Sequence, residues 1–186
     1  MNMYLIALYL HITGALAMFA GLGIEGVVFK NLKNASSPQQ AIPWLASMRI
    51  LRITFGYATV ALLLTGIYLV ILSWGWNSWV LSGLVLLVAL SGYGSTKGKK
   101  IGMSIASLLN SKDQSIPSEV KKIIADPFLM TTYKLKITIA LGIIFMMTTK
   151  PGWVGSILVV AASIAIGFVL DLPLKMKAEV KELESA

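Results

Sequence analysis

Long runs of apolar residues alternate with shorter polar stretches along this chain. A helix needs roughly 20 apolar residues to cross the hydrocarbon core of a bilayer, which is about 30 Å thick. The runs that reach or approach this length predict five membrane-spanning helices, at residues 4–29, 50–74, 79–96, 130–149 and 153–174. The first run has no basic beginning and is longer than the core of a signal peptide, so we expect it to remain as a helix. The pattern therefore predicts an all-α integral membrane helical bundle.

The polar stretch 97–126 is too charged to enter the bilayer, and it separates the third predicted span from the fourth. Apolar side chains recur at helical spacing in residues 100–109 and again in residues 118–124, which predicts two short amphipathic helices. Such helices suit either a docking or lipid-binding surface or a solvated connector. Asp126 and Pro127 read as the N-cap and first residue of the next helix. We expect the organisation to be a four-helix bundle with a cytoplasmic loop, a fifth transmembrane helix and a cytoplasmic tail, at residues 1–152, 97–126, 153–174 and 175–186.

Composition and charge give the expected orientation of the spans. Of the 186 residues 56% are hydrophobic and 13% charged, whereas soluble domains have about 45–50% and about 25%. This balance excludes an ordinary soluble enzyme, a disordered chain and, with no cysteine, a disulfide scaffold. The net charge of +8 does not indicate nucleic acid, because 15 of the 16 basic residues fall on or beside alternate loops. The positive-inside rule then places the N-terminus outside and the C-terminus in the cytoplasm. Interfacial tryptophans mark the two outer turns, at Trp74, Trp76, Trp79 and Trp153.

His11, the only histidine, lies inside the first predicted span, where an ionisable group is costly and is a candidate for function. Its helix face carries residues that leave room for a neighbouring helix or a flat ligand: Gly14, Ala15, Met18, Gly21 and Glu25. One interpretation is an axial ligand of haem. The other is an interhelical hydrogen bond to a residue such as Thr65 or Tyr68.

Methionines are the only further candidates for the ligand set. Met146 and Met147 come close to the expected depth of His11, and His/Met pairs ligate haem in cytochromes. Met18 lies on the helix face of His11 itself. A copper(I) site built from His and Met is a weaker alternative, since no clustered methionine spacing supports it.

A second group of ionisable residues is expected near the inner surface. Glu25 and Asp171 lie at the depth of Arg49 and Arg52, so they either form ion pairs or relay protons. The two arginines are three residues apart on one helix face, where they either bind a phosphate or propionate or simply anchor the topology.

Several sequence motifs occur in a recognisable order: ALYLHITGALAMFAGLG, RILRITFGYATVALLLTGIYLV, a Trp-containing outer turn, and MTTKPGW. In this order the chain resembles a bacterial superfamily of small membrane proteins over residues 4–152. The superfamily includes HemJ-type protoporphyrinogen oxidases and copper-resistance D-type domains, and the chain is most similar to its group of integral membrane proteins without assigned function. The resemblance implies a location in the bacterial inner membrane and a place for His11 matching a histidine implicated in haem binding. Residues 76–84 lack the lysine of the oxidases, so the resemblance does not carry over an oxidase reaction.

Three functions remain open from the sequence. The first is binding of haem b through His11, in electron transfer or haem handling. The second is a non-catalytic accessory or structural subunit of a membrane complex or homo-oligomer, packed through small residues. The third is a transporter of a small solute or ion, which the absence of repeats and of broken spans disfavours. No nucleophile–base pair, carboxylate dyad, phosphate loop or metal quartet occurs, so the sequence gives only weak support to an enzymatic function.

Overall fold

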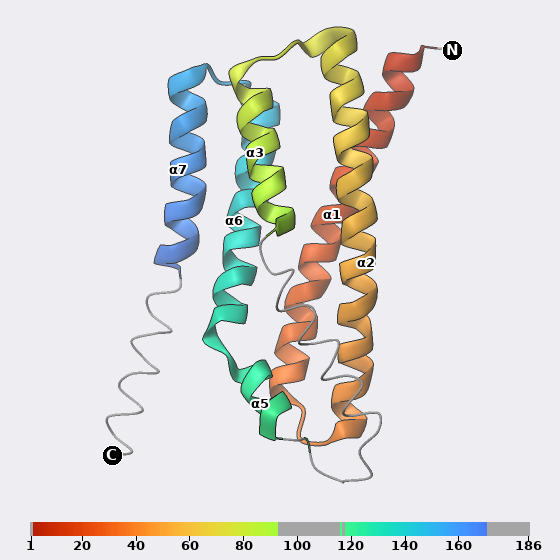
Figure 1. Cartoon of the computed structure of the whole chain (residues 1–186), viewed down its shortest axis with the longest axis vertical. Helices are drawn as coiled ribbons and strands as arrows, with labels where there is room; N and C mark the ends of the chain where they lie inside the picture. Colours follow the sequence, from red (N-terminus) through yellow and green to blue (C-terminus); the bar gives the residue numbers. More distant parts are fainter. Residues whose placement is uncertain (1, 93–115, 117, 171–186) are drawn as a thin grey trace. The chain divides into compact units, whose positions relative to one another are not determined.

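All regular structure that the computed structural model describes is helical, over residues 2–92, 116 and 118–170 (Figure 1). The elements are α1 (Met3–Asn34), α2 (Pro38–Leu69) with its π-helical continuation η1 (Val70–Trp74), α3 (Ser78–Gly92), α5 (Ser118–Ala125), α6 (Pro127–Thr149) and α7 (Trp153–Val169). The predicted all-α class is confirmed for this part of the chain. The amphipathic stretch predicted at 118–124 is confirmed as α5, and α6 begins at Pro127 as expected. The stretch 100–109, Asp171 and the tail lie outside the described residues.

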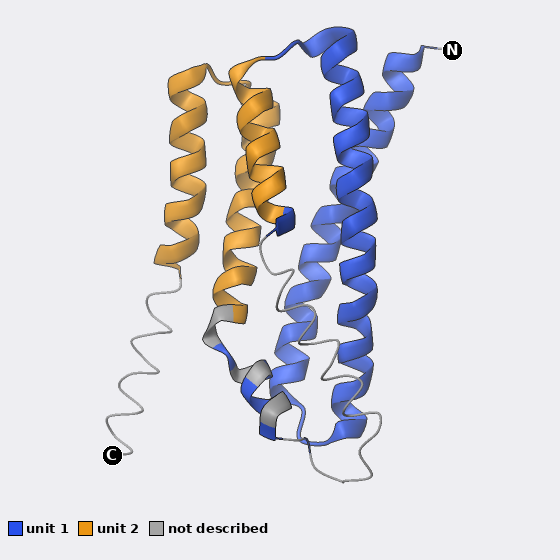
Figure 2. Cartoon of the chain, viewed as in Figure 1, with its two compact units in different colours: residues 1–76, 91–126 blue, residues 77–90, 127–186 orange. Residues whose placement is uncertain are grey.

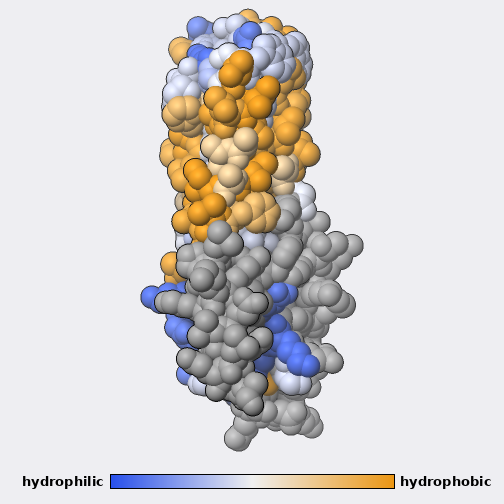
Figure 3. All heavy atoms as spheres, turned by 90° about the vertical axis from the view of Figure 1, so that its left-hand side faces the viewer, coloured by the Kyte–Doolittle hydropathy of each residue, from blue (hydrophilic) through white to orange (hydrophobic). Residues whose placement is uncertain are grey.

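Three of these helical segments are long and apolar enough to cross a membrane: Met3–Asn34, Pro38–Trp74 and Leu129–Thr149. Two further apolar helices, α3 and α7, are shorter over their described residues. On the face drawn in Figure 3, hydrophobic residues cover much of the described surface. The three long apolar helices include three of the five predicted runs, at residues 4–29, 50–74 and 130–149.

The first two helices extend further than the apolar runs predict. α2 begins at Pro38, where the pattern placed its start near residue 50, and with η1 it has 37 residues. At 1.5 Å per residue this makes about 55 Å of helix, and the 32 residues of α1 make about 48 Å. Both exceed the roughly 30 Å of a bilayer core.

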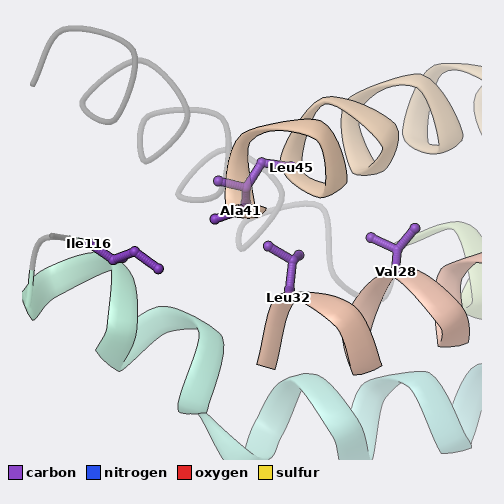
Figure 4. Packing of buried hydrophobic residues seen from close by; sticks show 5 residues of the cluster. All are labelled: Val28, Leu32, Ala41, Leu45 and Ile116. Atoms are coloured by element: carbon purple, nitrogen blue, oxygen red, sulfur yellow. The ribbon is translucent and has the colours of Figure 1, made fainter. Parts of the chain in front are cut away.

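A buried hydrophobic cluster explains the additional turns. Val28 and Leu32 of α1 meet Ala41 and Leu45 of α2, and Ile116, just before α5, completes the cluster (Figure 4). Each of the five side chains is at most 4% exposed. The polar sequence on either side of the α1–α2 turn thus stays helical because it buries its own small apolar core, a contact that a search for membrane spans does not reveal.

By its internal contacts the chain divides into two compact units (Figure 2). Unit 1 comprises residues 1–76 and 91–126, and unit 2 comprises residues 77–90 and 127–186. The fifth apolar helix, α7, belongs to unit 2 together with α3 and α6. The grouping of residues 1–152 into one bundle stays a prediction.

Unit 1 is built on the antiparallel pair α1–α2, and glycines set how closely the two helices approach. A Cβ atom added to Gly14 would lie 3.3 Å from Leu62 Cγ, and one added to Gly21 would lie 3.5 Å from the Phe55 ring. In each of these two contacts the two residue numbers add to 76, because a step forward along α1 corresponds to a step back along the antiparallel α2. This register runs the length of the pair and decides which residues of α1 and α2 share a level.

Unit 2 is built on α6 and α7, with α3 against α6, and its small residues are more tightly enclosed. A Cβ atom at Gly142 would collide with the Ser163 side chain. One at Gly167 would lie 2.7 Å from Leu135 Cδ1 and 2.8 Å from Thr138 Oγ1. Such contacts allow the backbones to approach closely, which is how helices associate where burial of apolar surface gives no driving force.

The turn between α6 and α7 is fixed by its own hydrogen bonds. Lys150 ends α6 in the left-handed conformation, with φ 48°, and its amide donates to the Met146 carbonyl. The hydroxyls of Ser78 and Ser156 both donate to the Pro151 carbonyl, at 2.9 Å and 3.1 Å. The Lys150 ammonium lies 5.5 Å from the centre of the Trp79 ring, a cation–π contact. Unit 2 therefore anchors the start of α3 to the α6–α7 turn.

Candidate functional site

His11 lies in a small polar cluster formed by α1, α2 and η1 of unit 1. Its Nδ1 atom lies 3.1 Å from Thr65 Oγ1, within hydrogen-bonding distance. The Trp74 ring meets the imidazole edge to face, with 5.9 Å between centroids and 81° between planes. The interhelical bond to Thr65, which the sequence offered as one role for His11, is therefore present.

The register of α1 and α2 and one glycine create the space for this imidazole. The residue numbers of His11 and Thr65 also add to 76. The register set by the Gly14–Leu62 and Gly21–Phe55 contacts therefore places these two residues opposite each other. A Cβ atom at Gly66 would lie 3.2 Å from His11 Cε1, tighter than most real contacts. The glycine thus lets the imidazole lie directly against the backbone of α2.

The π-helical segment η1 brings Trp74 into the cluster. A π-turn holds more residues than an α-turn, so it changes the direction in which the following side chains point. The segment closes with a bond from the Gly75 amide to the Val70 carbonyl, at 2.9 Å, and Gly75 has φ 69°, a conformation that glycine adopts freely. Trp74 Nε1 also donates to the Tyr4 hydroxyl, at 3.4 Å. Short π segments are frequent at functional sites, and this one positions a ring against the only histidine.

The cluster is half-buried, since His11, Thr65, Trp74 and Tyr4 all retain partial exposure. It lies far from the charged residues of its own two helices. Glu25 follows His11 by 14 residues, about 21 Å along the helix axis at 1.5 Å per residue. Within the described residues, the half of the α1–α2 pair that holds His11 thus contains no Asp, Glu, Lys or Arg side chain.

The inner residues that the sequence singled out do not meet His11. Arg52 precedes Thr65 by 13 residues, about 20 Å along α2, and Arg49 is one turn further away. The register places both arginines near the level of Glu25, as the depths predicted, and both side chains are exposed. A phosphate or propionate held by the two arginines would therefore be a separate site from the His11 cluster.

The two methionines considered as ligands lie in different surroundings. Met18 is buried in unit 1, 2% exposed, two turns of α1 away from His11. Met147 belongs to unit 2, where its Cε atom lies 2.9 Å from the position of a Cβ on Gly83. Within unit 1, the ring nitrogens of His11 are the metal-binding candidates that the cluster provides.

Within the described ranges, no group of three or more His, Asp or Glu residues is placed to hold a metal ion. The sequence did not point to Tyr4, Gly66 or Trp74 as neighbours of His11. Trp74 carried the signal of an interfacial aromatic, but an apolar run does not reveal a π-turn.

Comparison of the chain with protein-family models, with curated proteins and with solved structures finds no match.

Proposed function

We propose that this chain is a multi-pass protein of the bacterial inner membrane that binds haem b through His11, in electron transfer or haem handling. The proposed arrangement has five membrane spans, the N-terminus outside and the C-terminus in the cytoplasm. Fifteen of the 16 basic residues on or beside alternate loops support this topology.

The observation that carries the proposal is the tethering of His11 through one ring nitrogen only. Thr65 bonds to Nδ1, and Nε2 is the other nitrogen of the ring. Histidines that ligate metals characteristically use one nitrogen for the metal and the other for a hydrogen bond that fixes the ring. The half-buried position and the adjacent Gly66 and Trp74 suit a flat aromatic ligand.

In this arrangement His11 would hold the haem through its imidazole, and Thr65 would fix the orientation of that ring. Haem would supply an iron centre for one-electron chemistry, at a potential set by the axial ligand and the polarity around it. The chain's own contribution would be a single imidazole in apolar surroundings, with an indole at its edge.

The alternative function is a non-catalytic accessory subunit or homo-oligomer in which His11 only joins α1 to α2. The hydrogen bond to Thr65 supports this alternative too, because polar bonds between membrane helices contribute about 0.6 kcal/mol on average. Exposed apolar residues of α7, including Val154 at 74% and Leu158 at 63%, would then face lipid or a partner.

The variant His11→Asn separates the two functions. The asparagine amide can replace Nδ1 in the bond to Thr65, whereas nothing replaces Nε2. We expect the purified wild type to take up haemin in detergent with a Soret band, and His11→Asn to lose the band while keeping its unfolding midpoint. Thr13→Ala, on the exposed side of the same helix, is the matched control and should retain the band.

A wild type that takes up no haemin, or a His11→Asn variant with an unchanged Soret band, would contradict the haem proposal. A defined oligomer or a co-purifying partner that persists in His11→Asn would then favour the accessory function.

A further inference from the structure

The hydrogen bonds of Thr65 determine which nitrogen of His11 carries the proton. A hydroxyl group has one hydrogen to donate, and Thr65 Oγ1 lies 2.6 Å from the Ala61 carbonyl oxygen. A carbonyl can only accept, so the hydroxyl hydrogen is directed to Ala61. Toward His11 the same oxygen then acts as an acceptor, and Nδ1, 3.1 Å away, must be the donor.

A second carbonyl lies near the same hydroxyl. The backbone oxygen of Leu62 is 3.4 Å from Thr65 Oγ1, and it too can only accept. Both neighbours of the hydroxyl on its own helix, Ala61 O and Leu62 O, therefore take its hydrogen and not its lone pairs. A neutral imidazole has one N–H, so a proton held on Nδ1 leaves Nε2 with its lone pair.

We infer that Thr65 is the positioning residue that holds the single proton of neutral His11 on Nδ1 and so presents Nε2 as the ligating nitrogen. The use of Nε2 for haem iron rests on the function proposed above. The position of the proton does not, because it follows from the contacts within unit 1 alone.

The experiment exploits the single histidine of the chain. The full-length protein, labelled with ¹⁵N only in histidine and reconstituted in lipid nanodiscs, gives nitrogen spectra of one imidazole. At about pH 8.5, two units above the ordinary pKa of histidine, a neutral ring shows which nitrogen is protonated. We expect the wild type to carry the proton on Nδ1.

Two substitutions test the role of Thr65. Thr65→Val removes the acceptor with little change of shape, and the Nδ1–H population should fall while an Nε2–H signal appears. Thr65→Ser keeps a hydroxyl in the same turn and should restore the wild-type spectrum. Thr13→Val is the matched control, because Thr13 also donates to its own helix, at Tyr9 O, but has no bond to His11; its spectrum should be unchanged.

A proton on Nε2 in the wild type, or a Thr65→Val spectrum equal to that of the wild type, would overturn the inference. A haemin titration tests the ligand step separately. Loss of a partner that orients a ligating histidine typically weakens metal binding about 10–100-fold, and we expect this for Thr65→Val, with Thr65→Ser close to the wild type. Equal haemin affinity despite an altered tautomer would overturn the presentation of Nε2. A wild type that binds no haemin would remove the proposed function and leave the Nδ1 assignment intact.

Discussion

The helix pairs α1–α2 and α6–α7 both close on small residues, but they use the space for different purposes. In unit 2, Gly142 faces Ser163 and Gly167 faces Leu135 and Thr138, so small residues bring backbone and short side chains together. The hydroxyls there are satisfied within their own helices, by bonds from Thr138 to the Leu135 carbonyl and from Ser163 to the Val159 carbonyl. One charged group does reach across the pair, because the Lys134 ammonium donates to the Leu170 carbonyl, at 2.6 Å, in an exposed position at the end of α7.

In unit 1 the equivalent space admits a side chain that can do chemistry. Gly66 lies against the His11 ring, and Thr65 bonds both to its own helix and to that ring. A small residue in a helix pair therefore indicates close packing, and indicates a site only where it faces a titratable ring. Substitutions in unit 2 should therefore change stability alone, whereas those around His11 should change ligand binding more than stability.

The largest effect on stability is expected from Gly167→Ala. The new methyl group would meet Leu135 Cδ1 at 2.7 Å and Leu135 Cα at 3.1 Å, and the latter is backbone that cannot turn aside. Overfilling a close-packed contact costs about 1–3 kcal/mol. The midpoint of denaturant unfolding in detergent, followed by circular dichroism, measures the loss, and haemin binding should stay at the wild-type level.

Gly23→Ala is the control for this substitution, because a Cβ at Gly23 meets no atom within 4 Å. Replacing an uncrowded helical glycine by alanine gains up to about 1 kcal/mol. Equal midpoints for the two variants would show that the α6–α7 contact is not tight, and the contrast between the units would fail.

The location of the helices could be predicted from the sequence, whereas most of their contacts could not. Apolar runs mark the three long helices found in the described residues, because a helix that crosses a bilayer must be apolar over about 20 residues. Pro127 marks the start of α6 because proline suits a first helical turn. The pattern placed the start of α2 near residue 50 and not at Pro38, because hydropathy detects only the apolar part of the helix. The turns from Pro38 onward are stabilised instead by the Val28–Leu32–Ala41–Leu45–Ile116 cluster, which joins three segments.

The candidate site was predictable in part for the same reason. His11 stood out as the only histidine of the chain, inside an apolar run, and Thr65 was one of the partners suggested for it. Gly66, Tyr4 and Trp74 were not identified, because their roles depend on the α1–α2 register and on the π-turn at residues 70–74. Neither leaves a signal in hydropathy.

A second substitution, Gly66→Ala, should separate binding from stability within unit 1. The added Cβ would lie 3.2 Å from His11 Cε1, so the ring must shift by a few tenths of an ångström. The gain in helix propensity, up to about 1 kcal/mol, offsets this strain, and we expect an unfolding midpoint close to that of the wild type. Haemin affinity should fall, because the orientation of the imidazole changes.

The control for Gly66→Ala is Gly56→Ala on the same helix, where a Cβ meets nothing within 4 Å and haemin affinity should be unchanged. Unchanged affinity in both variants would mean that the contact between Gly66 and the ring has no role in binding.

The smallest effect is expected from Trp74→Phe, which tests the contribution of η1. Phenylalanine keeps an aromatic edge beside His11 but removes the Nε1 donor of the bond to the Tyr4 hydroxyl. That bond is long, at 3.4 Å, so its loss should cost no more than about 0.6 kcal/mol. Tyr4→Phe removes the other partner, and if the bond is all that links the two side chains, the double variant should unfold at the midpoint of either single variant. A double variant that loses the sum of both effects would show that Tyr4 and Trp74 act independently, and that the ring contact with His11 holds Trp74 in place without Tyr4.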